Sequence, residues 1–136
     1  MRAHLVPAGF VLVLAAGCGS EETHVNDDRP ASAVTVTASV VDGELTVSPT
    51  KIGAGPVRFL VSNQTQRDVR LTFETAGSEA GTTARSPSIA PAGVATLQAD
   101  PQEGEYELRA SDREIPPVTI TVGAPRASGQ DELLQP

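Results

Sequence analysis

A cysteine thiol can do several kinds of covalent chemistry, and this 136-residue chain has a single cysteine. Cys18 has no second thiol for an internal disulfide, so it is a candidate nucleophile, metal ligand, intermolecular disulfide partner or attachment point. A basic start, Met1-Arg2, and a mostly apolar run from Leu5 to Ala16 precede it. That run of 12 residues is shorter than the roughly 20 needed to cross a bilayer. A basic start, a short apolar run and small residues are typical of a secretory signal peptide.

The residues that close this run and follow it, Leu14-Ala15-Ala16-Gly17-Cys18, resemble the lipobox of bacterial lipoproteins. In that family the cysteine thiol is diacylated, with palmitate or related chains, and the chain is cut just before it. The resemblance implies a signal peptide over residues 1–17 and a mature chain that begins at Cys18. Ala15 stands where Leu is most usual, and the alternative is a free cysteine buried at the end of a hydrophobic helix. The residues of the cleavage motif are Leu14, Ala15, Ala16 and Gly17.

Lipid attachment at Cys18 predicts a protein that is held on the cell membrane, on its extracytoplasmic side, without spanning it. Two or more acyl chains hold a protein stably where one chain does not. Residues 18–32 are polar, acidic and aperiodic, which predicts a flexible tether after the lipidated cysteine. The membrane is therefore the partner expected through Cys18.

The tether also contains His24, Asp27 and Asp28, which are potential ligands for a divalent metal. Ordering such a segment around an ion costs about 1–2 kcal/mol per residue. We therefore interpret the three side chains as part of a solvated acidic tether and expect neither a metal nor a cofactor.

Three carboxylates, Glu103, Glu105 and Glu107, alternate along one expected strand. Paired carboxylates catalyse glycoside hydrolysis, so a carbohydrate-active hydrolase is one hypothesis. A solvated ladder beside Arg109 is the alternative that we prefer. Residues 33–123 contain no histidine for a hydrolytic triad, and we assign no catalytic residue. We expect the protein not to be an enzyme.

Charged residues also gather in two segments between expected strands. One is the "NQTQRD" loop and the other is the "SDREIPP" loop. If these loops meet at one end of the fold, they could form a rim that binds a partner protein or a small ligand. The alternative is that their charges only keep the domain soluble. The candidate binding rim consists of Arg67, Asp68, Arg70, Asp112 and Arg113.

The elements that must position these residues are short runs of alternating polarity. Period-two alternation of apolar and polar residues is typical of half-buried strands, and it occurs clearly in four runs and weakly in three others. No stretch of ten or more residues in this region keeps a helical period. The seven expected strands are "AVTVTASV", "ELTVS", "VRFLVSN", "DVRLTFE", "GVATLQA", "EYELRAS" and "PVTITVG".

Glycine and proline separate these runs. Asp42-Gly43 lies between the first two and is a strong hairpin signal. Seven short strands with such turns predict an all-β fold, a single Greek-key β-sandwich over residues 33–123. The small, polar residues 124–136 predict a disordered tail.

Within the sandwich the stretches "KIGAGPVRFLVSNQT", "SIAPAGVATL" and "PQEGEYELRAS" resemble segments of cupredoxin-like domains. An immunoglobulin-like sandwich is the alternative. In copper-binding cupredoxins a histidine follows the Asn, and a cysteine ends the Tyr strand, followed by a His and a Met. Val69 stands near the first of these positions and Ala110 at the second. Residues 33–123 contain no His, Cys or Met, so a type-1 copper site, which needs two imidazoles and a thiolate, is excluded.

The charge balance narrows the classes of partner. The chain has 10 Lys and Arg against 17 Asp and Glu, a formal net charge of -7, so nucleic acid is not an expected partner. These observations together predict a bacterial envelope lipoprotein whose non-catalytic, metal-free sandwich acts as a binding or accessory module. A metal-handling or electron-transfer protein of the cupredoxin family is the alternative.

Overall fold

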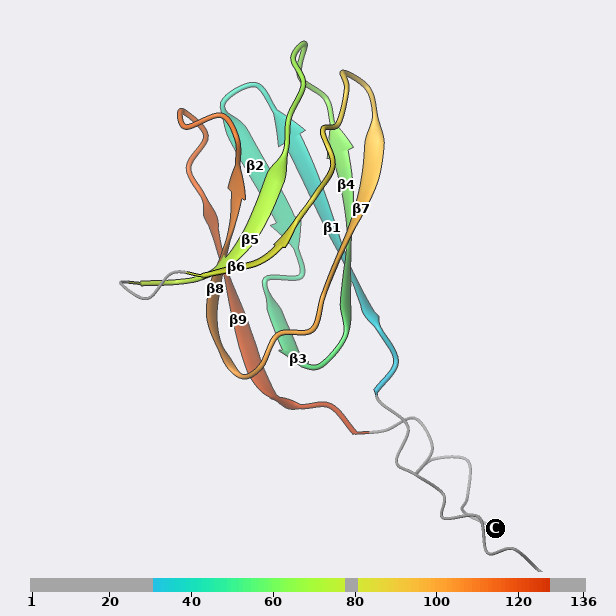
Figure 1. Ribbon diagram of the computed structural model, residues 1–136, viewed down its shortest axis with the longest axis vertical. Helices are drawn as coiled ribbons and strands as arrows, with labels where there is room; N and C mark the ends of the chain where they lie inside the picture. Colours follow the sequence, from blue (N-terminus) through green and yellow to red (C-terminus); the bar gives the residue numbers. More distant parts are fainter. Residues whose placement is uncertain (1–30, 78–80, 128–136) are drawn as a thin grey trace, which may run out of the picture.

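The computed structural model describes residues 31–77 and 81–127, which form two β-sheets packed face to face (Figure 1). The described residues contain no helix. The all-β sandwich predicted from the alternating runs is therefore confirmed. The strands are β1 (Val34–Val41), β2 (Glu44–Ser48), β3 (Lys51–Ala54), β4 (Val57–Asn63), β5 (Leu71–Thr75), β6 (Thr82–Arg85), β7 (Val94–Ala99), β8 (Gly104–Ala110) and β9 (Val118–Pro125).

The four-stranded sheet has the order β2-β1-β4-β7, and the five-stranded sheet has the order β3-β9-β8-β5-β6. The hairpin signal at Asp42-Gly43 is confirmed, because β1 and β2 pair antiparallel around it. Gly43 has φ +78°, a conformation that favours glycine. Two parallel pairs, β1 with β4 and β3 with β9, join strands that are distant in the sequence.

All seven predicted strands are present, with two short ones in addition. β3 and β6 have four residues each, too few for an alternation to stand out from the loops beside them. The expected strand "DVRLTFE" begins later than predicted. Val69 only bridges to Ile89, and regular pairing with β8 starts at Leu71.

The core lies between the sheets and is built mainly from the apolar residues of each alternating run. Three of the four aromatic side chains meet at its centre. The rings of Phe59 and Phe73 lie 5.0 Å apart, and those of Phe73 and Tyr106 are stacked at 4.8 Å. Phe59 and Phe73 are fully buried. One aromatic cluster therefore joins β4 of one sheet to β5 and β8 of the other.

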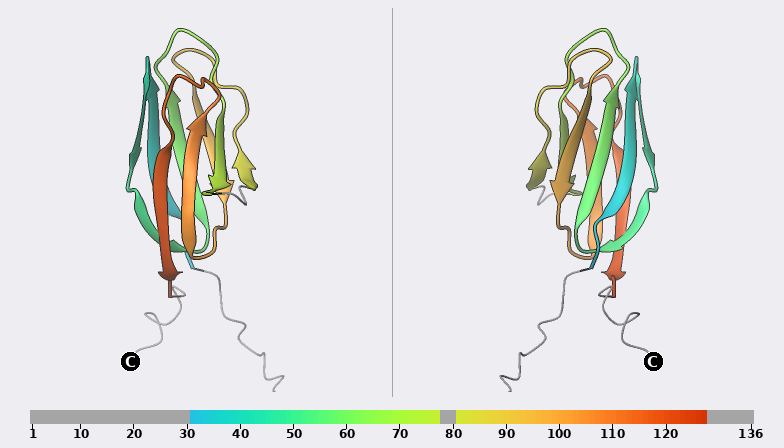
Figure 2. Two further views of the ribbon diagram at one scale, coloured as in Figure 1. Left: turned by 90° about the vertical axis from the view of Figure 1, so that its left-hand side faces the viewer. Right: turned by 90° about the vertical axis from the view of Figure 1, so that its right-hand side faces the viewer.

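The described chain begins and ends at the same end of the sandwich (Figures 1 and 2). There the Arg126 guanidinium donates hydrogen bonds to the backbone carbonyls of Gly53 and Ala54, both at 3.2 Å, and of Ser32 and Pro56. The β1–β2 turn and the β4–β5 and β8–β9 loops lie at the opposite end, which we call the distal end.

Candidate binding rim at the distal end

The two charged loops predicted to form a rim do meet at the distal end. Arg67 in the β4–β5 loop and Asp112 in the β8–β9 loop form an ion pair of 2.8 Å between Nη2 and Oδ2. Next to it, the Arg70 backbone N–H donates to Ser111 Oγ at 3.1 Å, and the Ser111 backbone N–H donates to the Arg70 carbonyl at 2.8 Å. The Arg67 side chain is 73% exposed, so the ion pair lies at the surface and contributes little stability.

A buried amide sets the path of the β4–β5 loop. Asn63 ends β4 and is 1% exposed. Its Nδ2 donates to the carbonyls of Arg67 at 2.7 Å and of Ile89 at 2.8 Å, and its Oδ1 accepts from the Thr65 backbone N–H at 3.0 Å. The Thr65 hydroxyl lies 2.8 Å from Asn63 Oδ1 and 2.9 Å from the Arg67 carbonyl. This network holds Arg67 at the rim.

The two loops and the β1–β2 turn enclose a hollow of about 280 Å³. Its floor contains Val69 and Ile115, each 3% exposed. Four of the five predicted rim residues line it, and Arg70 does not. Alternating patterns gave no sign that the β1–β2 turn would join the rim, because only the topology brings it there. The lining is Asp42, Gly43, Thr65, Arg67, Asp68, Val69, Ser111, Asp112, Arg113 and Ile115.

The positions where the cupredoxin resemblance places copper ligands are occupied by buried hydrocarbon. Val69 is 3% exposed and Ala110 is 4% exposed, and both belong to the hydrophobic core. Neither side chain has a donor atom for a metal, so the residues present do not fit a type-1 copper ion. Among the described residues there is no group of three or more His, Cys, Asp and Glu side chains that could hold a metal ion.

Two of the glutamates considered for catalysis, Glu105 and Glu107, lie on the outer face of the five-stranded sheet, and none of the three lines the distal hollow. Glu105 and Glu107 belong to β8, whereas Glu103 precedes it. Arg109 bonds to Glu74 at 2.8 Å and also to Glu107. The hydrogen bond that the Arg109 guanidinium donates to Glu74 is the main cause of the raised pKa of Arg109. One of the three candidate carboxylates, Glu107, thus shares the Arg109 guanidinium with Glu74 on an exposed surface.

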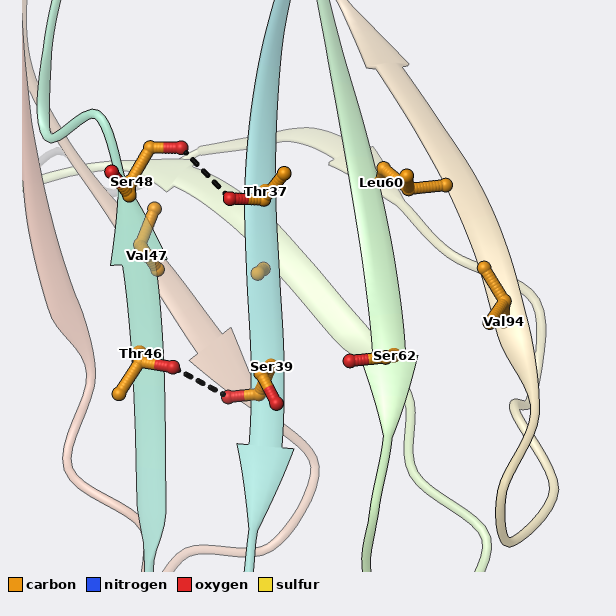
Figure 3. Close-up of a pocket in the computed structure, with 9 residues that line it drawn as sticks. Thr37, Ser39, Thr46, Val47, Ser48, Leu60, Ser62 and Val94 are labelled. Carbon is orange, nitrogen blue, oxygen red and sulfur yellow. Dashed lines mark hydrogen bonds between the residues drawn. The ribbon is translucent and has the colours of Figure 1, made fainter.

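A second hollow, of about 270 Å³, lies on the outer face of the four-stranded sheet (Figure 3). Its sides carry hydroxyls, and the Thr37 hydroxyl donates to the Ser48 carbonyl at 3.2 Å. Leu60 and Val94 stand on the other side of the hollow, 43% and 64% exposed. No motif in the sequence marked this surface, because its residues come from four strands.

The predicted sites in the N-terminal part lie outside the described residues. These are the cleavage motif, the lipidation site Cys18 and the possible metal ligands His24, Asp27 and Asp28. Within the described segments, no helix is long and apolar enough to span a membrane.

Comparison with known proteins finds likeness in structure only. No family model matches the sequence, and no curated protein matches it. Auracyanin A, a "blue" copper protein from the green thermophilic photosynthetic bacterium Chloroflexus aurantiacus, superposes with a TM-score of 0.56 at 13% identity, over 68% of this chain and 100% of its own. Two other structures also match. Lac15 from a marine microbial metagenome has a TM-score of 0.46 at 13% identity, over 69% of this chain and 28% of its own. A multicopper oxidase has a TM-score of 0.46 at 14% identity, over 70% of this chain and 45% of its own.

The fold is therefore cupredoxin-like rather than immunoglobulin-like. The identity to auracyanin A is too low to transfer anything beyond the fold. The chain keeps the sandwich and has hydrocarbon at the two positions where the resemblance places copper ligands.

Proposed function

We propose that this protein is a bacterial envelope lipoprotein that presents a metal-free, non-catalytic cupredoxin-like sandwich as a binding module. The distal rim is the proposed binding surface, and its partner is an envelope protein or a small ligand. The observation that carries the proposal is that buried hydrocarbon stands where the resemblance places copper ligands, with Val69 near the first position and Ala110 at the second. Val69 also lines the hollow that the charged rim surrounds. Because neither position offers a metal ligand, we infer that the distal end binds a partner and not a metal ion.

The position of the rim supports this arrangement. The described chain begins, just before β1, at the end of the sandwich opposite the rim (Figure 1). A chain attached to the membrane through Cys18 would then present the rim away from its attachment point. Arg70 and Arg113 are exposed and form no ion pair within the described segments, so their guanidiniums are open to a partner.

The anchor is tested by mass spectrometry of the mature protein isolated from bacterial membranes. We expect a chain that begins at a diacylated Cys18 and a Cys18→Ser variant that no longer fractionates with the membrane. A mature chain that retains Met1, or carries an unmodified Cys18, would contradict the anchor.

The rim is tested by placing a photo-crosslinking amino acid at Arg113 in intact cells, with Thr119 on the outer face of the five-stranded sheet as the matched control. We expect a discrete adduct from position 113 and none from position 119. The adduct should weaken when Arg70→Glu is added. Equal labelling from both positions would contradict a specific rim.

The metal-handling alternative takes its support from the likeness to a "blue" copper protein. Titration of the protein with Cu²⁺ separates the two proposals. Stoichiometric binding with an intense visible charge-transfer band would overturn the metal-free module, whereas weak binding without that band is expected.

A further inference from the structure

The two outer faces of the sandwich differ in charge. The five-stranded sheet presents Lys51, Glu74, Arg85, Glu107 and Arg109 among its outward residues. The outer face of the four-stranded sheet has Glu44 and Arg58 as its charges, and between them it presents hydroxyls, amides and apolar groups. These are Thr35, Thr37, Ser39, Thr46, Ser48, Leu60, Ser62, Val94, Thr96 and Gln98. This weakly charged face also carries the hollow of Figure 3.

The four edge strands differ in how they are protected from pairing with another chain. Charges, prolines, bulges and shortness are the usual protections. β3 contains Lys51, and its register with β9 shifts. β6 has only four residues, and its register with β5 also shifts. β2 begins at the charged Glu44 and is followed by Pro49. β7 has six residues, a regular register with β4, and neither a charge nor a proline. β7 is thus the least protected edge.

The hydrogen bonding of β4 fixes which backbone groups of β7 face outward. The Asn63 N–H donates to the Gly93 carbonyl at 2.9 Å, so residues 93, 95, 97 and 99 direct their backbone groups toward β4. Val94, Thr96 and Gln98 therefore direct their N–H and C=O groups away from it. β6 contacts β7 at this edge of the sandwich but belongs to the other sheet (Figure 2). Within the described segments, these outward groups make no hydrogen bond to another element.

Apolar surface adjoins the same edge. Val94 is 64% exposed and Leu60 is 43% exposed, and they are the two large apolar side chains left open within the described segments. Leu60 lies on β4, directly beside Thr96 of β7. An added strand at β7 would therefore gain both backbone hydrogen bonds and apolar contact.

We propose that β7 is a homodimerisation edge, at which β7 of a second copy of this chain adds antiparallel. Thr96 lies opposite Thr96 of the second copy, on the two-fold axis, and Val94 lies opposite Gln98. This register gives all three outward residues a partner, and threonine pairs are favourable across strands. Asp100, just beyond β7, then lies near uncharged Ala92 of the second copy, so no like charges meet. The inference goes beyond the proposed function, because the edge is separate from the rim.

Disulfide trapping tests the register directly. In the full chain carrying Cys18→Ser, a Thr96→Cys variant has a single thiol, and hydrogen-bonded antiparallel partners lie about 5.5 Å apart between Cα atoms, within disulfide range. The matched control is Thr46→Cys, an exposed position on β2 at the far edge of the same sheet. We expect Thr96→Cys to form the disulfide dimer at least about tenfold faster, because pairing raises the effective concentration of the second thiol. Equal rates would overturn the proposal.

Sedimentation equilibrium with two matched double variants tests the contacts. Val94→Lys with Gln98→Lys places like charges opposite one another in both symmetric pairs and should raise the dimer dissociation constant about tenfold. Val94→Glu with Gln98→Lys places opposite charges there and should keep the dimer. Thermal unfolding of each variant as a monomer checks that the fold is retained. A natural chain that stays monomeric at every concentration, or two variants that associate equally, would contradict the β7 edge.

Discussion

Asn63 is the residue whose role changes most between sequence and structure. It lies in Asn63-Gln64-Thr65, which matches an N-glycosylation acceptor pattern, and in a bacterial lipoprotein the sequence favours a turn residue instead. In the fold it is 1% exposed, and its amide joins the β4–β5 loop to the segment at Ile89. A buried amide with both donors and its acceptor bonded is costly to remove.

Replacing Asn63 by alanine should therefore lower the free energy of unfolding by about 3 kcal/mol, because the amide's hydrogen bonds to the Arg67 and Ile89 carbonyls and from the Thr65 N–H are all lost, at about 1 kcal/mol each. Urea unfolding measures the change. Gln64→Ala is the control, since Gln64 is exposed and its loss should cost less than about 0.5 kcal/mol. Similar values for the two variants would show that the network does not hold the loop.

Arg109 has a different kind of role, because Glu74 and Glu107 are direct register partners on neighbouring strands. Without the guanidinium, two carboxylates would face each other. Arg109→Gln should destabilise the protein by at most about 1 kcal/mol at low salt, because exposed ion pairs are weak. The loss should shrink in high salt, which screens the repulsion, and when Glu107→Gln is added. Urea unfolding at two salt concentrations measures both effects, and a loss that grows with salt would contradict this account.

At the scale of elements, the turn that leads into β7 is strained at one residue and tight at the next. Ala92 has φ +59°, in the left-handed region. Ala92→Gly should raise stability by about 0.5–1 kcal/mol, because relief of the left-handed strain exceeds the added entropy of the unfolded chain. Gly93→Ala should lower stability, because its Cβ would lie 2.7 Å from the Ala90 carbonyl oxygen. Melting temperatures measure both, and changes of equal sign would refute this description of the turn.

Alternating polarity predicted the long strands because each buries one face, as in β4, where Val57, Phe59 and Val61 are buried between exposed neighbours. It missed β3 and β6, which are strands chiefly because longer strands pair with them. The distal rim was predicted in part. The charged loops were visible in the sequence, but the contribution of the Asp42-Gly43 turn depends on topology. The apolar hollow of Figure 3 was not predicted, since its residues are scattered over four strands.

At the scale of the whole molecule, Arg126 holds together the end of the sandwich where the described chain begins and ends. Its guanidinium connects β9 to the segment before β1 and to the β3–β4 connection. Arg126→Ala should cost about 2 kcal/mol in urea unfolding and speed proteolysis near Ser32. Arg126→Lys should restore less than half of the free energy of unfolding that Arg126→Ala loses, because an ammonium cannot donate to several carbonyls in the planar geometry of a guanidinium. Arg85→Ala, at an exposed arginine on β6, is the control and should be nearly neutral.

The parallel pairing of β1 with β4 has a mechanical consequence. β1 starts at the end where the described chain begins and runs toward the distal end, and seven residues of it are in register with β4 (Figure 1). Tension between that end and a partner held at the distal end would act along these strands. It would shear the whole register at once and would not peel one hydrogen bond after another. The sandwich is therefore oriented to resist pulling along its long axis.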